Sequence, residues 1–166
     1  DQWQQWNSRI TSMGWKVKWG VEDPEGNGNG EDAIHGEAHE DRSGWSVDLN
    51  YDGSIMAIGA PYDGAYSQTN NQHQTGYASV FQNINGNWVQ LGQDFNGSSN
   101  SDHFGWSVSL SSDGNTVAIG GPGNNSGKVR VYNLDSISWI QIGQDIDGEA
   151  IGDNSGHSVS VSSDGN

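Results

Sequence analysis

The residues best suited to chemistry are acidic ones that recur at short spacing near the end of the chain. One segment holds four of them at its first, third, fifth and ninth positions: Asp145, Asp147, Glu149 and Asp153. Calcium needs several oxygen ligands around one point, and this spacing is typical of acidic calcium loops. An earlier segment carries oxygen-bearing side chains at the same positions: Asp94, Asn96, Ser98 and Asp102. The sequence predicts a calcium site in the later segment and a weaker one in the earlier segment.

The same acidic residues also have a purely structural interpretation. The sixth position of the later segment is Ala150, whereas calcium loops usually place Gly there, and no bidentate Glu follows at the twelfth. In this alternative, Asp94 and Asp145 cap turns. Asp41, Asp102 and Asp153 then accept hydrogen bonds from backbone amides of their loops. Both interpretations stay open on the sequence alone.

Other polar motifs are few. Two N-x-[ST] sequons begin at Asn96 and Asn124, both in predicted loops, and predict glycan attachment in an exported eukaryotic protein. The five histidines show no metal-ligand spacing, and no Ser stands in the G-x-S-x-G context of a hydrolase nucleophile. We therefore predict no catalytic residues and no cofactor other than Ca²⁺.

Composition limits the partners. The chain has 166 residues, 25 Gly, 8 Trp, no Cys, only six Lys and Arg, and a net charge of −15. Such acidity predicts repulsion from nucleic acids and from anionic membrane surfaces. No apolar run approaches the roughly 18 residues of a membrane span, so we expect no membrane insertion. The chain begins at Asp1, and we expect a processed protein or a fragment.

Three segments align without gaps and reveal an internal repeat. They are GEAHEDRSGWSVDLNYDGSIMAIGAP (36–61), GSSNSDHFGWSVSLSSDGNTVAIGGP (97–122) and GEAIGDNSGHSVSVSSDGN (148–166). The first two copies continue in parallel, and their difference in length lies in a polar stretch between Pro61 and Gly76, predicted to be a surface loop. His157 replaces the Trp of the other copies, so we expect it to be packed.

Each full repeat predicts four antiparallel strands. Period-two alternation marks the first strand, a continuous apolar run the second, and an Asp-Gly dipeptide typical of two-residue hairpins separates them. The first repeat predicts strands at 44–50, 55–59, 77–81 and 88–91, and the second at 105–111, 116–120, 128–132 and 139–142. Trp88 and Trp139 recur at one position and are predicted to pack between repeats. Four such strands per repeat are typical of a β-propeller blade.

The recurring motifs resemble the FG-GAP repeat of integrin α-like propellers. The resemblance rests on Phe104-Gly105-Trp106-Ser107-Val108, on Ile119-Gly120-Gly121-Pro122 with its counterpart at 58–61, and on the Gly-x-Val-x-Val-Tyr run at 127–132. It implies a ring of about seven blades, extracellular and used in adhesion or ligand binding. The motif's Phe is kept only at Phe104, and the family's calcium loop between the two motifs is reduced to a short turn.

The expected fold is therefore all-β, an incomplete array of propeller blades. Residues 1–34 form a Trp-rich lead-in from a degenerate or partial preceding blade. Residues 35–95 are the first full repeat, 96–146 the second, and 147–166 a truncated third. We refer to these three repeats as the first, second and third units.

Three functions remain open. The first is an extracellular interaction module, a glycoprotein without catalysis that binds a protein or glycan ligand at a cell surface or matrix. The second is a structural subunit of a surface filament or sheath that self-assembles through repeats and open blade edges. The third, less favoured, is a propeller glycosidase.

Overall fold

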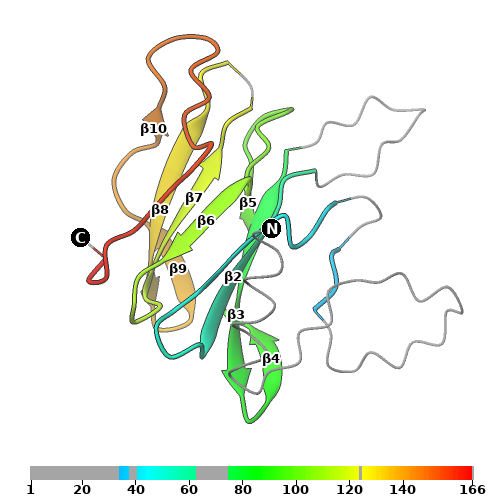
Figure 1. Ribbon diagram of the computed structural model, residues 1–166, viewed down its shortest axis with the longest axis vertical. Coiled ribbons are helices and arrows are strands. Elements are labelled where there is room, and N and C mark those ends of the chain that lie inside the picture. The colour runs from blue at the N-terminus through cyan, green and yellow to red at the C-terminus, as the bar shows by residue number, and fades with distance from the viewer. Residues whose placement is uncertain (1–33, 38–40, 63–74, 124, 166) are drawn as a thin grey trace, which may run out of the picture. The chain divides into compact units, whose positions relative to one another are not determined.

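The computed structural model describes residues 34–37, 41–62, 75–123 and 125–165 (Figure 1). Contacts between residues divide the chain into two compact parts, Asp1–His35 and Gly36–Asn166, which are distinct from the repeat units. All described strands belong to the second part. The predicted lead-in 1–34, except its last residue, and residues 63–74 of the predicted insert lie outside the described residues.

The first unit forms a five-stranded antiparallel sheet in the order β1-β2-β3-β4, with β5 also paired to β3. Its strands are β1 (Ser46–Leu49), β2 (Ile55–Ala60), β3 (Tyr77–Ile84), β4 (Asn87–Gln90) and β5 (Phe95–Asn96). The second strand is buried at every position, as its continuous apolar run predicted, whereas β4 is mostly exposed.

The second unit forms an equivalent sheet, in which β6 to β10 repeat the pairings of β1 to β5. Its strands are β6 (Ser107–Leu110), β7 (Thr116–Gly121), β8 (Lys128–Asp135), β9 (Ser138–Gln141) and β10 (Ile146–Asp147). Register agrees position for position: Ser46 pairs with Gly59 as Ser107 pairs with Gly120. For the described residues, which contain no helix, the predictions of an all-β fold and of two equivalent antiparallel sheets are confirmed.

Two local predictions are wrong. The Asp-Gly turns are not two-residue hairpins, because Asn50 N donates to Ile55 O at 3.0 Å and leaves residues 51–54 in the turn. Gly53 has φ +72°, which explains why Gly is required there. The short strands β5 and β10 also lie in segments that were expected to be loops.

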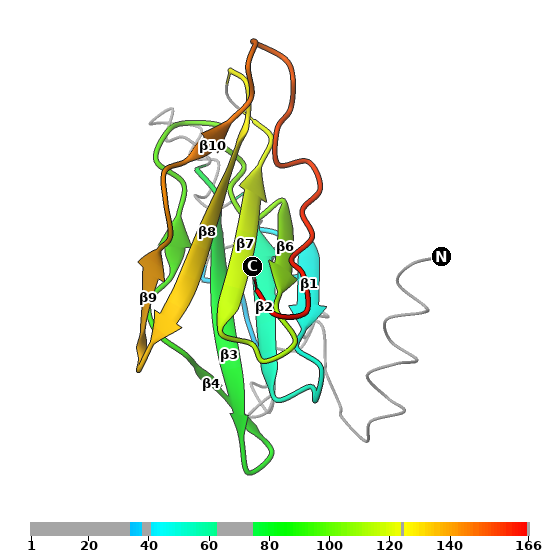
Figure 2. The same cartoon turned by 90° about the vertical axis from the view of Figure 1, so that its left-hand side faces the viewer.

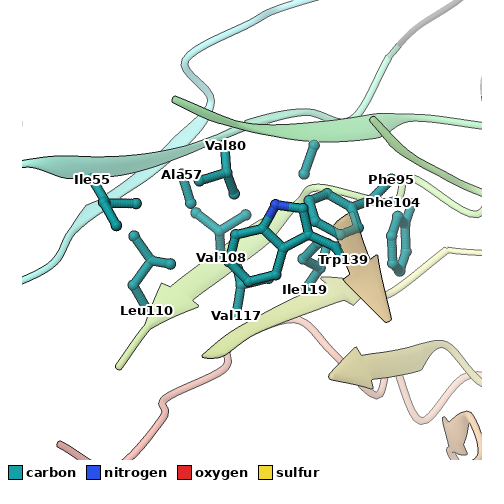
Figure 3. Packing of buried hydrophobic residues seen from close by; sticks show 11 residues of the cluster. Ile55, Ala57, Val80, Phe95, Phe104, Val108, Leu110, Val117, Ile119 and Trp139 are labelled. Atoms are coloured by element: carbon teal, nitrogen blue, oxygen red, sulfur yellow. The ribbon is translucent and has the colours of Figure 1, made fainter. Parts of the chain in front are cut away.

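A single apolar cluster joins the two sheets. Ile55, Ala57 and Val80 of the first sheet point toward Val108, Leu110 and Val117 of the second (Figure 3). The alternation along β6 places its two apolar residues on this side and its two serines on the other. Burial of each such aliphatic side chain contributes roughly 1.5–3 kcal/mol, so the two sheets stabilise one another.

Glycines bring the two units into direct backbone contact. A Cβ atom built on Gly59 would collide with the carbonyl oxygen of Gly105, so only Gly fits at that point of β2. The same carbonyl accepts a hydrogen bond from Ser46 Oγ at 2.8 Å. The glycines of the two recurring sequence motifs therefore meet each other across successive units.

The third unit docks on the second in the same way. Ser107 Oγ donates to Gly156 O at 2.8 Å, and a Cβ atom on Gly120 would collide with that oxygen. Further along, Val161 N donates to Ser109 Oγ at 3.1 Å, as Leu110 N donates to Asp48 Oδ2 at 2.7 Å in the first joint. The C-terminal segment accordingly runs along the second sheet beside β6 (Figure 2). One mode of packing thus relates successive units.

Candidate binding surface

A row of aromatic rings lies where each unit begins its first strand. The rings belong to Trp45, Trp106 and His157, which occupy the same position in successive units. Their centroids are 4.7 Å apart between Trp45 and Trp106 and 5.7 Å apart between Trp106 and His157. The ring planes are tilted by 53° and 46°, so neighbouring rings do not stack flat on one another. We call these three residues the aromatic row.

The backbone explains why the rings line up. Each ring follows a glycine in the left-handed region, Gly44, Gly105 or Gly156, with φ values of 88°, 87° and 85°. A residue with a Cβ atom is strained in that conformation, and a Cβ on Gly105 would also meet the carbonyl oxygen of Tyr77. The glycine turn therefore fixes where the following ring can lie, and the packing of units sets the spacing.

Three further side chains flank the aromatic row. Tyr62 lies 5.9 Å from Trp45 and 6.4 Å from Trp106, measured between ring centroids. The Arg42 guanidinium lies 4.3 Å from the centroid of the Tyr62 ring, within range of a cation–π interaction. The ring of His103, the counterpart of Arg42 in the second unit, lies 5.1 Å from that of Tyr62. Together they form a surface of rings with a cation at one end.

The charge of this surface depends on His103. Burial lowers the pKa of His103 below its ordinary value, and the nearby Asp102 carboxylate partly opposes that effect. The imidazole is therefore neutral at pH 7, and Arg42 supplies the fixed positive charge. Trp45 exposes 39% of its surface, so a ligand can reach this ring.

Such a surface has the chemistry to bind a ligand. Aromatic faces and edges attract apolar C–H surfaces, while Arg42 and the imidazoles offer hydrogen-bond donors and acceptors beside them. Saccharides present this combination of C–H faces and peripheral hydroxyls. His157 was expected to be packed, and its ring lies against that of Trp106, with the centroids 5.7 Å apart.

The predicted calcium residues are placed differently. Asp145 Oδ2 lies 2.9 Å from Arg130 Nη2 and 3.8 Å from Lys128 Nζ. Its pKa is lowered, chiefly by the hydrogen bonds from Arg130 and with a further contribution from Gln141. Asp147 lies in β10, where its backbone pairs with Lys128. Asp153 Oδ2 accepts a hydrogen bond from Ala150 N at 2.8 Å.

The earlier segment also engages its oxygen atoms within the chain. Asp102 Oδ2 accepts hydrogen bonds from Ser98 N and Ser99 N, both at 2.8 Å. Asp94 Oδ1 accepts from Ser79 Oγ and from Gln90 Nε2. Asn96 lies in β5 and its carbonyl accepts from Arg130 Nη1 at 3.3 Å. Within the described ranges no three His, Cys, Asp or Glu side chains are grouped so that they could hold a metal ion, and calcium binding stays a prediction.

The remaining predictions concern the two glycan acceptors and the recurring tryptophans. The Asn96 side chain is exposed, as a glycan acceptor must be, whereas Asn124 lies outside the described residues. Packing between units is confirmed for Trp139, which is 3% exposed and donates its Nε1–H to Leu91 O at 2.8 Å. The sequence signal for the aromatic row was an aromatic residue directly after the recurring glycine. Tyr62 and Arg42 had no such signal.

Comparison with known proteins finds no match that would assign the chain to a family. No model of a known protein family matches it, and no curated protein matches it significantly. Among the described residues there is also no helix of the length and apolar character that crossing a membrane requires.

Proposed function

We propose that this chain is a stretch of an extracellular β-propeller of the FG-GAP type, and that it binds a glycan ligand at the aromatic row without catalysing a reaction. The blade interpretation is supported by two equivalent sheets that pack through one repeated mode. The glycines that make this packing possible belong to the sequence motifs that resemble the FG-GAP repeat. A cell-surface or matrix location follows from the resemblance and from the sequons.

One observation carries the binding function. The aromatic row places one ring per unit at contact distance, next to Arg42 and Tyr62, on a surface that solvent reaches. Clusters of exposed rings are unusual on a protein surface unless they bind something. The ligand we propose is a neutral or weakly charged saccharide chain. A strongly anionic one would be repelled by a protein with net charge −15.

The test compares an aromatic residue inside the row with one outside it. Trp45→Ala removes one ring of the aromatic row, whereas Tyr51→Ala removes an 87% exposed ring at the opposite end of β1. Retention in native gels containing neutral polysaccharides, or on a glycan array, should be lost with Trp45→Ala and kept with Tyr51→Ala. Equal retention of both variants, or no retention of the unaltered chain on any glycan, contradicts the proposal.

The second candidate is a structural subunit of a filament or sheath. Successive units present different faces to each other, because the apolar face of the first sheet that holds Ile55 packs on the face of the second that holds Val108. Such head-to-tail packing forms rings when the rotation closes and open filaments when it does not. Electron microscopy of the concentrated chain distinguishes the two candidates.

A further inference from the structure

Arg42, the cation beside the aromatic row, is held differently from the other cations of the described residues. Lys128 and Arg130 both lie near the carboxylate of Asp145, at 3.8 Å and 2.9 Å. Arg42 is exposed, and its guanidinium lies over an aromatic ring instead, 4.3 Å from the centroid of Tyr62. Within the part of the chain that the structure describes, no carboxylate forms an ion pair with Arg42. Its charge is therefore presented to solvent next to the rings.

The acidic residue that precedes Arg42 points into the fold. Asp41 is 5% exposed, and its carboxylate accepts hydrogen bonds from Ser43 N and from the Tyr77 hydroxyl, both at 2.9 Å. Asp102, at the same position of the second unit, is 1% exposed and accepts hydrogen bonds from backbone amides of its own loop. The first unit thus buries this acid and leaves the positive charge of the next residue at the surface. In a chain with net charge −15, such a place is unusual and suits an anionic group.

The geometry around Arg42 favours a carboxylate attached directly to a sugar ring. A guanidinium that rests on a ring keeps N–H donors along its edges, and a carboxylate accepts two of them side by side. The guanidinium carbon lies 5.7 Å from the ring centroid of Trp45, so the anion must be close to the sugar that contacts this ring. The carboxylate of a hexuronic acid is bonded to the pyranose ring itself. A sulfate ester on the corresponding carbon of a neutral hexose stands further out.

We propose that the aromatic row and Arg42 together recognise a saccharide chain that carries one hexuronic acid, with its carboxylate on Arg42 and the adjoining neutral sugars on Trp45 and Trp106. This inference rests on the proposed function and names the class of saccharide. A chain with a negative charge on every sugar would be repelled by the net charge of −15. The neutral imidazole of His103 adds no second positive charge at pH 7. One acidic sugar therefore matches the one fixed cation of this surface.

Isothermal titration calorimetry with matched oligosaccharides tests the proposal. Oligosaccharides of glucose, mannose and galactose are each used in three forms. One form is unmodified, the second has a single primary hydroxyl oxidised to a carboxylate, and the third has a sulfate ester at that carbon. The unaltered chain should bind the carboxylate form about two- to fivefold more tightly than the neutral form, which is the range of an exposed ion pair. The sulfated form should bind less tightly than the carboxylate form.

Two variants assign the preference to Arg42. Arg42→Asn removes the guanidinium, and Asn154 at the matching position of the third unit has the same φ of 55°. In this variant the neutral and carboxylate forms should bind with equal affinity. Lys128→Gln is the matched control, because it also removes one positive charge, from an ammonium that lies beside Ser98 and outside the aromatic row. Its preference for the carboxylate form should be that of the unaltered chain, with circular dichroism showing that both variants are folded.

The outcomes separate this inference from the proposed function. Equal affinity of the unaltered chain for the neutral and carboxylate forms overturns the inference and keeps the aromatic row as a site for neutral glycans. A sulfated form that binds as tightly as the carboxylate form overturns it as well, and so does a preference that survives in Arg42→Asn. If the unaltered chain binds none of the oligosaccharides in any form, both the inference and the proposed glycan binding fail.

Discussion

The first and second units have the same backbone and different polar side chains at matched positions. In the first unit Ser79 Oγ donates to Asp94, whereas its counterpart in the second, Arg130, forms an ion pair with Asp145. Arg130 also reaches back to Ser98 Oγ at 3.0 Å and thereby ties the second sheet to the loop that leads into it. The same position of the repeat therefore carries a neutral hydrogen bond in the first unit and an ion pair in the second.

A second polar position differs just as much. Tyr77 donates its hydroxyl proton to Asp41 Oδ2 at 2.9 Å and accepts from Glu37 N, and burial raises its pKa. Its counterpart Lys128 instead lies near Asp145 and Ser98. The glycine contacts between units, in contrast, are the same in both joints. Close backbone packing therefore defines the repeat, while polar pairs are interchangeable.

The largest expected difference between the units concerns their two matched tryptophans. Trp139→Ala removes the indole that packs on Gly92 and Phe95 of the first unit, and removal of a fully buried Trp costs about 3–5 kcal/mol of unfolding free energy. Trp88→Ala should cost roughly half as much, because Trp88 is only half-buried. Urea unfolding of both variants measures the difference. Equal losses would show that the two units are held by the same contacts after all.

The next effect compares the two glycine joints. Gly59→Ala forces the first and second units apart and should cost about 1–3 kcal/mol. Gly120→Ala meets the third unit, which lies outside the apolar cluster, so that segment can detach while both sheets stay folded. Hydrogen exchange should then rise at residues 155–165 and stay unchanged in β2 and β7. Uniformly faster exchange in both variants would contradict the separate behaviour of the joints.

The sequence predicted the features that follow from local patterns and missed those that depend on contacts between distant residues. Alternation along residues 46–49 and the apolar run 55–60 predicted strands, because each pattern reflects a burial that the backbone imposes. The strands β5 and β10 have two residues each, too few for any period to show. The ion pair of Asp145 with Arg130 could not be predicted, because Arg130 lies fifteen positions earlier, on β8. The aromatic row, likewise, is assembled only when units pack.

A smaller effect distinguishes Arg42 from its counterpart His103 in their response to pH. Burial lowers the pKa of His103, so the folded state favours the neutral imidazole. The contribution to stability is complete above the ordinary value of 6.5 and is lost as pH falls through the lower folded-state pKa. The loss is modest, because the side chain is only half-buried and solvent screens its charge.

His103→Asn is the control for this pH effect, since Asn occupies the matching position 154 and accepts the positive φ found there. Urea midpoints at pH 7.5 and 5.5 should differ more for the unaltered chain than for the variant. The comparison stays above the range in which Asp52, Asp113 and Asp145 are protonated, because the pKa of each is lowered further below 3.8. Identical pH profiles would show that His103 does not titrate differently on folding.

The smallest expected effect is that of calcium, which compares the loop 145–153 with the loop 94–102. An ion at the later loop must displace Arg130 from Asp145 and Ala150 N from Asp153, so we expect weak binding. When free Ca²⁺ equals Kd the gain is only about 0.4 kcal/mol, or a rise in Tm of roughly 1–2 °C. EDTA should reverse it and Asp147→Ala should remove it, whereas Ser98→Ala in the earlier loop should not. Arg130→Gln should enlarge the calcium response, because it frees the Asp145 carboxylate. A shift that equimolar Mg²⁺ reproduces, or none in Arg130→Gln, would assign these carboxylates to the internal contacts alone.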